Sequence, residues 1–411
     1  MKTTIRLALA IFLLAPSLSR PTGYDLPNMG SRDLALAGSA VADQVDAAAA
    51  IANPSALARQ PGFGLSFSAG YLDLETTWTA TTGDLAPYSP ETTDYHPTPP
   101  PVLAVSYGFE LAGRRAGVGL GFNVIGGGNM YWADDWAGRG RIITVDRKLY
   151  GVYLTAGYEV LPQLRVGGGL VYVHSTEYLK QGIEPYADAY GELDTSGGGV
   201  GFDLSAEWRP LPSLSFGADF KFQVDLSLEG DGHFQVPDAL KPSLPDQGAR
   251  HDLTYPSILH MGVAWRPVAP VQVLFDYTFA DYSVYVEDRF VGDAGFLAVV
   301  PRDYDDGHTF RLGTEWDATA RLVVRAGVLR DLSGVKTDNY SPTLPDSDSW
   351  VLSGGLGWRF SPALTANAAV YHAWRDEIAS TGADAFPGSY RTTALLASVG
   401  LSWRPGAGRT E

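Results

Sequence analysis

The sequence predicts an all-β fold, an antiparallel transmembrane β-barrel of about fourteen strands with a small N-terminal helical hatch in its lumen. Three observations lead to this fold class. Apolar and polar residues alternate along strand after strand, short Pro-rich turns alternate with long polar loops, and a tryptophan closes every second strand. The candidate strands run roughly 11–15 residues, which exceeds the usual strand and suits a tilted membrane strand.

The segment Ser213–Leu226, "SLSFGADFKFQVDL", has an apolar residue at every second position. Such alternation indicates a strand with one apolar and one polar face. In a membrane barrel the apolar face contacts lipid and the polar face lines the lumen. Lys221 must then face the lumen, because a lysine on the lipid face near the bilayer centre costs about 2–4 kcal/mol.

Five tryptophans are predicted to lie at one end of the barrel, because up-and-down topology brings the ends of alternate strands together. Tryptophan favours the membrane–water interface, so the five are expected to form an aromatic girdle. The alternative is that they are unrelated core residues. They are Trp208, Trp265, Trp316, Trp358 and Trp403.

Composition narrows the functional classes. The net charge of −16 argues against nucleic-acid binding, and the absence of cysteine excludes disulfides and thiolate metal sites. No metal site and no cofactor is expected. The sequence contains no G-x-S-x-G, H-E-x-x-H, G-K-[ST] or G-x-G-x-x-G motif, so it is not expected to be an enzyme.

The N-terminus predicts an exported protein. Lys2 and Arg6 precede an apolar run, and small residues follow, as in a secretory signal peptide over residues 1–19. An N-terminal membrane anchor is the alternative. Residues 20–62 are rich in alanine and end a helical pattern at Asn53-Pro54, so they are expected to plug the lumen as the hatch. A mobile periplasmic extension is the other interpretation.

The segment 23–57, "GYDLPNMGSRDLALAGSAVADQVDAAAAIANPSAL", resembles the hatch of FadL-type outer-membrane transporters of long-chain fatty acids and hydrophobic compounds. Asn53, Pro54 and Ser55 match the family's Asn-Pro-Ala motif, with Ser in place of Ala. The resemblance continues, in order, through the segments 236–283 and 308–372. The barrel is assigned to 63–404 and a C-terminal tail to 405–411; this tail after Trp403 departs from the terminal aromatic residue that barrel assembly machinery recognises.

The resemblance implies passive uptake of long-chain fatty acids or other hydrophobic compounds across the bacterial outer membrane by a monomer in contact with outer-membrane lipid. A ligand would be caught by external loops, pass to a lumen pocket and leave sideways through the wall. The lateral exit in the family lies at a kink in the third strand, next to the hatch motif. Here Gly126, Gly127 and Gly128 interrupt that strand, although they also fit a strand end that enters a loop.

Two further sets of ligand contacts follow from the resemblance. Gly23 and Tyr24 correspond to a terminal pair that reaches the ligand pocket, or they serve packing alone. The partly helical external loop 227–255 is expected to form a capture groove. Leu240 and Leu244 would supply its apolar floor, and Lys241 and Arg250 would meet a carboxylate or remain solvated charges.

Two other functions compete with this interpretation. A hydrophilic porin would have an open, ion-conducting lumen, whereas a lumen filled by the hatch supports the transporter of hydrophobic compounds. A surface adhesin would carry its chemistry in the external loops alone.

Overall fold

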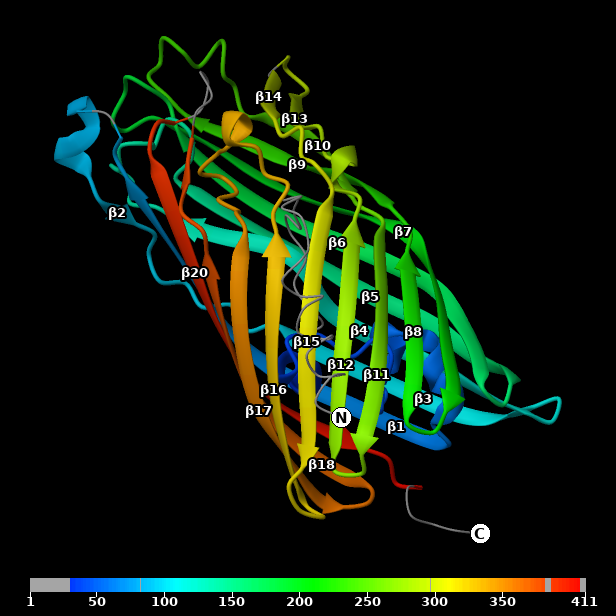
Figure 1. The fold of residues 1–411 in the computed structure, drawn as a ribbon. Coiled ribbons are helices and arrows are strands. Elements are labelled where there is room, and N and C mark those ends of the chain that lie inside the picture. The colour runs from blue at the N-terminus through cyan, green and yellow to red at the C-terminus, as the bar shows by residue number, and fades with distance from the viewer. Residues whose placement is uncertain (1–29, 82, 296, 381–385, 407–411) are drawn as a thin grey trace.

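The computed structural model describes residues 30–81, 83–295, 297–380 and 386–406, and it confirms the predicted barrel (Figure 1). Fourteen antiparallel strands form the wall. The barrel is closed because the first wall strand pairs with the last, from Leu65 opposite Trp403 to Thr79 opposite Ser389. The predicted signal peptide, Gly23 and Tyr24 lie outside the described residues.

The elements fall into three groups. The wall strands are β1 (Gly62–Thr79), β3 (Pro101–Leu111), β4 (Arg114–Tyr131), β5 (Thr144–Leu161), β6 (Leu164–Gly182), β7 (Tyr190–Leu211), β8 (Leu214–Lys221), β11 (Ile258–Val268), β12 (Val271–Ala280), β15 (Gly307–Asp317), β16 (Leu322–Leu332), β17 (Ser349–Ser361), β18 (Leu364–Arg375) and β20 (Ser389–Trp403). The external elements are β2 (Glu91–Thr92), β9 (Val224–Gln235), β10 (Gln247–Tyr255), β13 (Glu287–Gly292), β14 (Leu297–Pro301), β19 (Ile378–Ala379) and the 3-10 helices η2 (Gly83–Tyr88), η3 (Tyr282–Val284) and η4 (Thr337–Asn339). The hatch consists of α2 (Ser31–Ala35), α3 (Ala49–Ala52) and the 3-10 helix η1 (Pro54–Arg59).

The two faces of the wall differ as predicted. All five girdle tryptophans are exposed on the outside, between 41% for Trp403 and 52% for Trp265. Along β7, Phe202 and Leu204 are exposed, whereas Asp203, Ser205 and Glu207 at the alternate positions are buried on the lumen side. Side chains of successive strand residues point to opposite faces, so this pattern places lipid outside and the polar row inside.

The prediction of one continuous strand over Ser213–Leu226 is wrong for the second half of this segment. The chain breaks between β8 and β9, and the matching break on the neighbouring chain falls between β10 and β11, where the Gln223 N–H donates to Ser257 Oγ over 3.1 Å. The break reverses the faces. Phe216 and Phe222 are exposed outside, but Val224 and Leu226, which keep the same spacing, are buried. Because apolar and polar residues keep alternating through the break, the sequence gives no sign of it.

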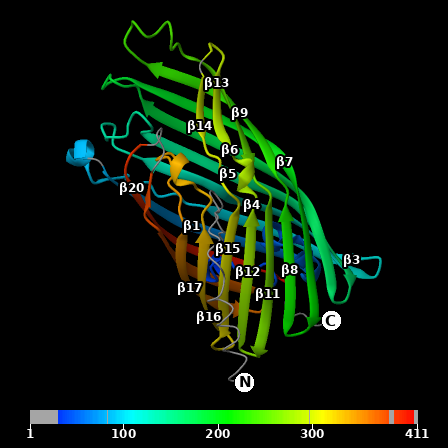
Figure 2. The same ribbon diagram turned by 45° about the horizontal axis from the view of Figure 1, so that its top comes forward.

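The segment 227–255 is not the partly helical loop that was expected. It forms a β-hairpin, in which β9 pairs with β10 from Val224–Tyr255 to Gly232–Gln247, and β10 also pairs with β13. Together with the β13–β14 hairpin it extends the barrel beyond the other strands at the external end (Figure 2). Only the tip around Asp238–Ser243 is a turn.

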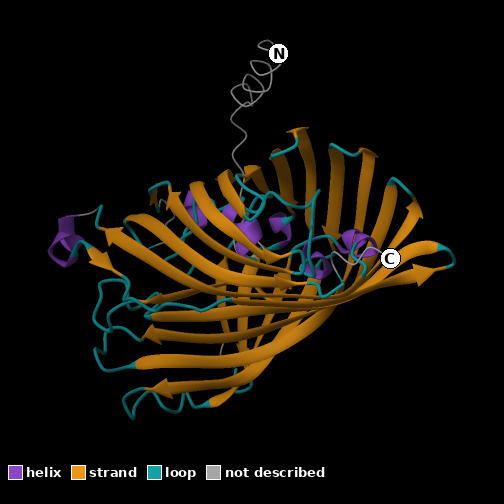
Figure 3. Cartoon of the chain, turned by 90° about the horizontal axis from the view of Figure 1, so that it is seen from below, coloured by secondary structure: helices purple, strands orange, loops and turns teal. Residues whose placement is uncertain are grey.

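The hatch lies inside the ring of strands, as the view from below shows (Figure 3). Glycines of the inner rows allow it to approach the wall closely: a Cβ at Gly117 would lie 2.5 Å from the Leu57 carbonyl oxygen. The alanines and glycines therefore fit one another across this contact. In the described part of the chain no helix has the length and apolar character needed to cross a membrane.

Substitution on the lipid face should show the depth dependence of a bilayer. We expect Leu204→Arg, on the lipid-facing row in the interior of β7, to lower the free energy of unfolding by about 2–4 kcal/mol. Leu211→Arg, an equally exposed position beside the turn, should cost about 0–1 kcal/mol because arginine there reaches water. Urea unfolding in lipid vesicles measures both, and equal costs would contradict the membrane placement.

Candidate functional site: the lumen cavity and the wall opening

A buried ion network fixes the hatch to the wall. Glu207 of β7 is 1% exposed and pairs with Arg59 of the hatch at 3.0 Å, with Arg165 at 3.2 Å and with Arg209 at 2.9 Å. Arg209 also pairs with Asp43 of the hatch. Because removing one partner of a buried ion pair is costly, this network opposes displacement of the hatch.

A second part of the network lies at the other side of the hatch. Arg32 of α2 donates to Glu315 Oε2 from Nε over 3.1 Å and to the Asp43 carbonyl oxygen over 2.9 Å. Burial alone would raise the pKa of Asp43, but Arg59, Arg32 and Arg209 outweigh it and hold the pKa well below its usual range. The Asp43 carboxylate therefore stays charged, and its contribution to stability is lost only as the pH falls through that depressed pKa.

The hatch motif lies against β5, β6 and β7. Asn53 caps η1, its Nδ2 donates to the Val41 carbonyl oxygen over 2.8 Å, and the Ser55 N–H donates to Ser205 Oγ of β7 over 2.9 Å. A Cβ at Gly157 would lie 2.4 Å from the Pro54 carbonyl oxygen. Asn53, Pro54 and Ser55 thus hold the hatch in place, and the structure does not bring them to Gly126, Gly127 and Gly128.

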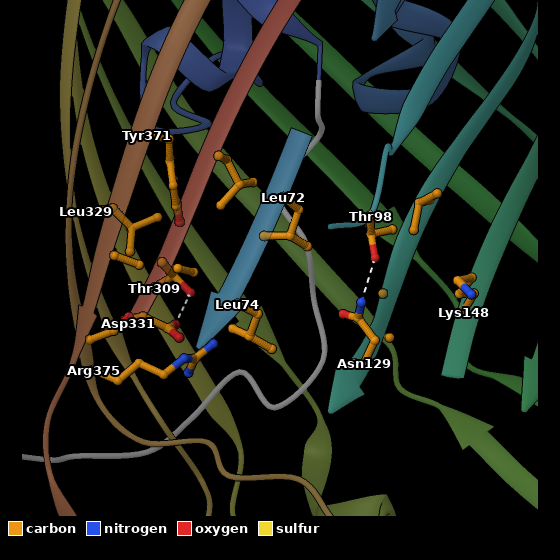
Figure 4. A pocket seen from close by; sticks show the side chains of 18 of the residues that line it. Leu72, Leu74, Thr98, Asn129, Lys148, Thr309, Leu329, Asp331, Tyr371 and Arg375 are labelled. Carbon is orange, nitrogen blue, oxygen red and sulfur yellow. Dashed lines mark hydrogen bonds between the residues drawn. The ribbon is translucent and has the colours of Figure 1, made fainter. Parts of the chain in front are cut away.

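A cavity, here called the main cavity, lies in the lumen (Figure 4). Its apolar lining comes from strands on opposite sides of the closure between β1 and β20, together with β4. These residues are Leu72, Leu74, Val124, Leu329, Tyr371, Ala373, Ala394 and Leu396. Gly126, Gly127 and Gly128 also line it, so the structure places these sequence-predicted residues at a cavity.

The lumen changes character along its length. Near the hatch the inward row of β7 is acidic, whereas farther toward the external end seven inward residues of β6, β9 and β10 are apolar and buried. These residues are Val171, Val173, Val224, Leu226, Leu228, Leu253 and Tyr255, and they belong to one hydrophobic cluster that also contains Leu72, Leu329 and Leu396. This apolar part of the lumen suits a hydrophobic ligand rather than hydrated ions.

Polar groups occupy one edge of the main cavity. Thr309 Oγ1 donates to Asp331 Oδ1 over 2.8 Å (Figure 4). Arg375 pairs with Asp346. Across the cavity, Lys148 Nζ lies 2.7 Å from Asp146. The cavity therefore joins an apolar surface to a few convergent polar groups, which is the usual make-up of a small-molecule site.

The wall opens beside the main cavity. The β3–β4 ladder ends at the pair Val102 and Asn123, although β4 continues to Tyr131. Just past this point the β4–β5 register shifts between Val124 and Gly126, and Gly127 has φ +131°. A bulge at Ile125 thus comes directly before the three glycines, on the edge of β4 that β3 leaves unpaired.

Prolines explain why the ladder stops there. The chain opposite the bulge reads "HPTPPP", and Pro97, Pro99 and Pro100 have no N–H to donate to β4. Thr98 lies between these prolines and hydrogen-bonds to Leu72 of β1. Its N–H donates to the Leu72 carbonyl oxygen over 3.0 Å, and its carbonyl oxygen accepts from the Leu72 N–H over 2.9 Å. The segment therefore completes the edge of β1 and leaves a gap toward β4, which we call the wall opening: it lies between residues 96–101 and 124–129.

Two further cavities adjoin the main one. The outer cavity shares Gly128 and Arg147 with it and is lined by Val145, Leu179, Phe290, Val300 and Leu344 near the external end. The lower cavity shares Arg311 and reaches Ile51 and Ala52 of the hatch, Asn123 and Ile125 of β4, and Lys221. The three cavities follow one another from the external end to the hatch.

The predicted capture residues lie elsewhere. Lys241 pairs with Asp238 at 2.8 Å and Arg250 pairs with Asp252 at 2.7 Å, all of them exposed. Leu240 and Leu244 are half-buried at the tip of the β9–β10 hairpin. None of these four residues lines the main, outer or lower cavity.

Sequence reasoning missed the proline segment and the apolar part of the lumen. The proline run was a usable signal, because four prolines over residues 97–101 beside a predicted wall strand predict an interrupted ladder. The apolar lumen gave no comparable signal, since inward and outward apolar residues look alike once a strand break reverses the faces. Among the described residues, no group of three His, Asp or Glu is placed to hold a metal ion.

The fold and the site together define a class: a membrane β-barrel plugged by its own N-terminal segment, with an apolar cavity beside an opening in the wall. The family described as outer membrane protein transport protein (OMPP1/FadL/TodX) matches residues 23–403. The chain belongs to this family, and it is an outer-membrane transport protein rather than an enzyme.

Individual relatives are distant in sequence. The "47 kDa outer membrane protein" of Pasteurella multocida (strain Pm70) is 25% identical over 185 residues, which are 42% of this chain and 43% of that protein. The match thus spans less than half of this relative. A Pseudomonas aeruginosa FadL homologue is 16% identical, with a TM-score of 0.84 over 93% of this chain and 99% of that one. The P. putida toluene transporter TodX is 16% identical, with a TM-score of 0.72 over 92% and 98%.

Proposed function

We propose that the protein takes up long-chain fatty acids or other hydrophobic compounds passively across the outer membrane and releases them sideways through the wall opening. The ligand enters the outer cavity, passes Gly128 and Arg147 into the main cavity, and leaves between β4 and the proline segment into lipid. The names of the structural relatives, a FadL homologue and a toluene transporter, agree with a hydrophobic ligand.

One observation carries the proposal: the apolar main cavity is lined by the same glycines that edge the wall opening. A hydrophobic ligand that leaves there passes from an apolar cavity into hydrocarbon and avoids water. The path straight down is opposed by the hatch, whose Arg59 and Asp43 are held by buried ion pairs. A hydrophilic porin would need a hydrated lumen, whereas many inward residues above the hatch belong to one buried hydrophobic cluster.

The polar edge of the main cavity accommodates an amphipathic ligand. Lys148 and Arg375 line it together with Leu72 and Leu396, so a carboxylate and an acyl chain both find suitable neighbours. Both cations already have a carboxylate partner, and a ligand carboxylate would share these pairs. We include Leu240, Leu244, Lys241 and Arg250 in the proposal only as a first contact outside the cavities.

Filling the junction at Gly128 tests the path. A Cβ there would meet no atom within 4 Å, so Gly128→Trp should fold and project into the space that joins the main and outer cavities. We expect the initial rate of labelled oleate uptake by cells to fall by about tenfold or more, because the indole removes the continuous apolar path. A cell strain without its own transporters of this family gives the background.

The matched control is Gly83→Trp. Gly83 begins η2, outside the barrel, and a Cβ there also meets no atom within 4 Å. This variant should transport at the wild-type rate. Both variants should show the heat-dependent gel mobility of a folded barrel. Wild-type uptake by a folded Gly128→Trp variant would disprove the proposed path, and ion conductance without oleate uptake by the wild type would favour a porin.

A further inference from the structure

One side chain spans the wall opening. Asn129 of β4 lies on the edge that β3 leaves unpaired, and its Nδ2 donates to Thr98 Oγ1 over 2.8 Å and to the His96 carbonyl oxygen over 2.9 Å (Figure 4). Both acceptors belong to the segment that completes β1. The carboxamide therefore joins the two sides of the opening where no β-ladder does.

The backbone closes the opening only at its two ends. At one end Val102 pairs with Asn123, and at the other the Asp94 N–H donates to the Tyr131 carbonyl oxygen over 2.7 Å. Between these ends, the hydrogen bonds that described residues make across the gap come from Asn129. The rings of His96 and Tyr131 add a contact next to them, with centroids 3.8 Å apart.

The surroundings of Asn129 allow this link to open. Gly126, Gly127 and Gly128 precede it and carry no side chain, and the facing prolines have no N–H. Asn129 is half-buried, so water can replace either acceptor when the side chain turns away. Breaking the link requires no break in a β-ladder, because β4 remains paired with β5 from Gly127–Lys148 to Tyr131–Thr144.

We infer that Asn129 is a latch that sets the size of the wall opening and thereby selects ligands by their cross-section. This inference rests on the proposed lateral release. With the latch closed the opening is divided, and a slender acyl chain passes on one side of the carboxamide. A broad, rigid ring system needs the latch to open before it reaches lipid. Asn129 is thus a specificity-determining residue of the exit rather than of the cavity.

The experiment compares a slender with a broad probe. Initial uptake rates of oleate and of pyrene are measured in cells, each corrected for cells that lack the protein. We expect Asn129→Ala, which removes both hydrogen bonds across the gap, to raise the ratio of the pyrene rate to the oleate rate by about threefold or more. Thr98→Val keeps the shape of Thr98, leaves the His96 acceptor in place and should raise the ratio less.

The two substitutions should not add. The effect of Thr98→Val depends on the Asn129 donor, so the double variant should match Asn129→Ala alone. Thr92→Val is the matched control: it removes the 2.9 Å hydrogen bond between Thr92 and Thr77, which joins β2 to β1 away from the opening. This control should leave the ratio unchanged.

The outcomes separate the latch from the proposed path through the cavities. An unchanged ratio in folded Asn129→Ala and Thr98→Val, with uptake still blocked in Gly128→Trp, would overturn the latch and leave that path standing. Wild-type uptake of both probes by Gly128→Trp would overturn the proposed path and the latch with it. A raised ratio in Asn129→Ala that Thr92→Val does not reproduce would support the latch.

Discussion

Glu207→Gln is expected to loosen the hatch and to lower the free energy of unfolding by about 3–5 kcal/mol, the cost of breaking a buried ion pair. The substitution keeps the shape of the side chain and removes its charge. Three guanidinium groups then lose a buried partner at 2.9–3.2 Å: Arg59 of the hatch, and Arg165 and Arg209 of the wall. The two carboxylates that remain, Asp43 and Glu159, cannot balance the charge of three guanidinium groups.

Two measurements test this expectation. Urea unfolding in lipid vesicles reports the loss of stability, and planar-bilayer recordings report ion conductance, which should rise as the hatch becomes mobile. The control is Glu184→Gln, where a carboxylate that is 59% exposed pairs with Arg139. A surface pair of this kind contributes about 0–1 kcal/mol. Equal stability and conductance in wild type and Glu207→Gln would show that the network does not hold the hatch.

The sequence predicted the wall well because the membrane imposes simple rules on it. Trp208, Trp265 and their three counterparts mark one interface, and the alternation around Lys221 assigns the two faces correctly within β8. The rules fail where the chain leaves the regular sheet. Nothing in the residues 213–226 shows the break at Phe222–Gln223, because the alternation continues through it while the backbone turns.

The site was predictable in part. The triple glycine at 126–128 indicates an irregular strand, and the structure places it directly after a bulge and beside the main cavity. Its partner across the gap, the proline segment, comes from a different part of the chain, and only the barrel register brings the two together. The hatch motif was less predictable, because Asn53–Ser55 resembles a motif next to the exit but packs against β5–β7. Ser55→Arg would therefore disturb the hatch rather than the exit.

A buried charge cluster that sequence reasoning overlooked joins the external hairpin to the wall. His251 of β10 is fully buried, with Nδ1 at 2.7 Å from Glu177 and Nε2 at 3.1 Å from Asp288. Asp288 of β13 also accepts two hydrogen bonds from Arg302, over 2.8 and 2.7 Å. The cluster holds the β13–β14 hairpin, which supplies part of the lining of the outer cavity.

The geometry requires a charged imidazole. Both ring nitrogens of His251 face carboxylates, and only the imidazolium can donate to both. Burial alone would lower the pKa of His251, but Glu177 and Asp288 outweigh burial and raise it above 6.5. Burial would raise the pKa of Asp288, but Arg302 and Arg147 outweigh it and hold that pKa well below 3.8.

These shifts fix the pH dependence of the hairpin. The contribution of His251 is fully present below its unfolded pKa of about 6.5 and is lost as the pH rises through the higher folded value. The contribution of Asp288 is present above its unfolded pKa of about 3.9 and is lost only as the pH falls through the depressed folded value. The cluster is therefore strongest between these limits and weakens on the alkaline side.

Asp288→Asn should release the hairpin and flatten this profile. The neutral amide leaves Arg302 and His251 without a carboxylate between them, so the local stability of β13–β14 should fall by about 3–5 kcal/mol at pH 6. Amide hydrogen exchange of residues 287–292, corrected for intrinsic rates between pH 5 and 9, measures this loss. Wild-type protection should decrease toward pH 9, whereas protection in the variant should be low throughout. The control is Asp252→Asn, which removes a carboxylate from an exposed ion pair beside His251 and should keep the wild-type profile. If Asp288→Asn also kept the wild-type profile, the cluster would not hold the hairpin.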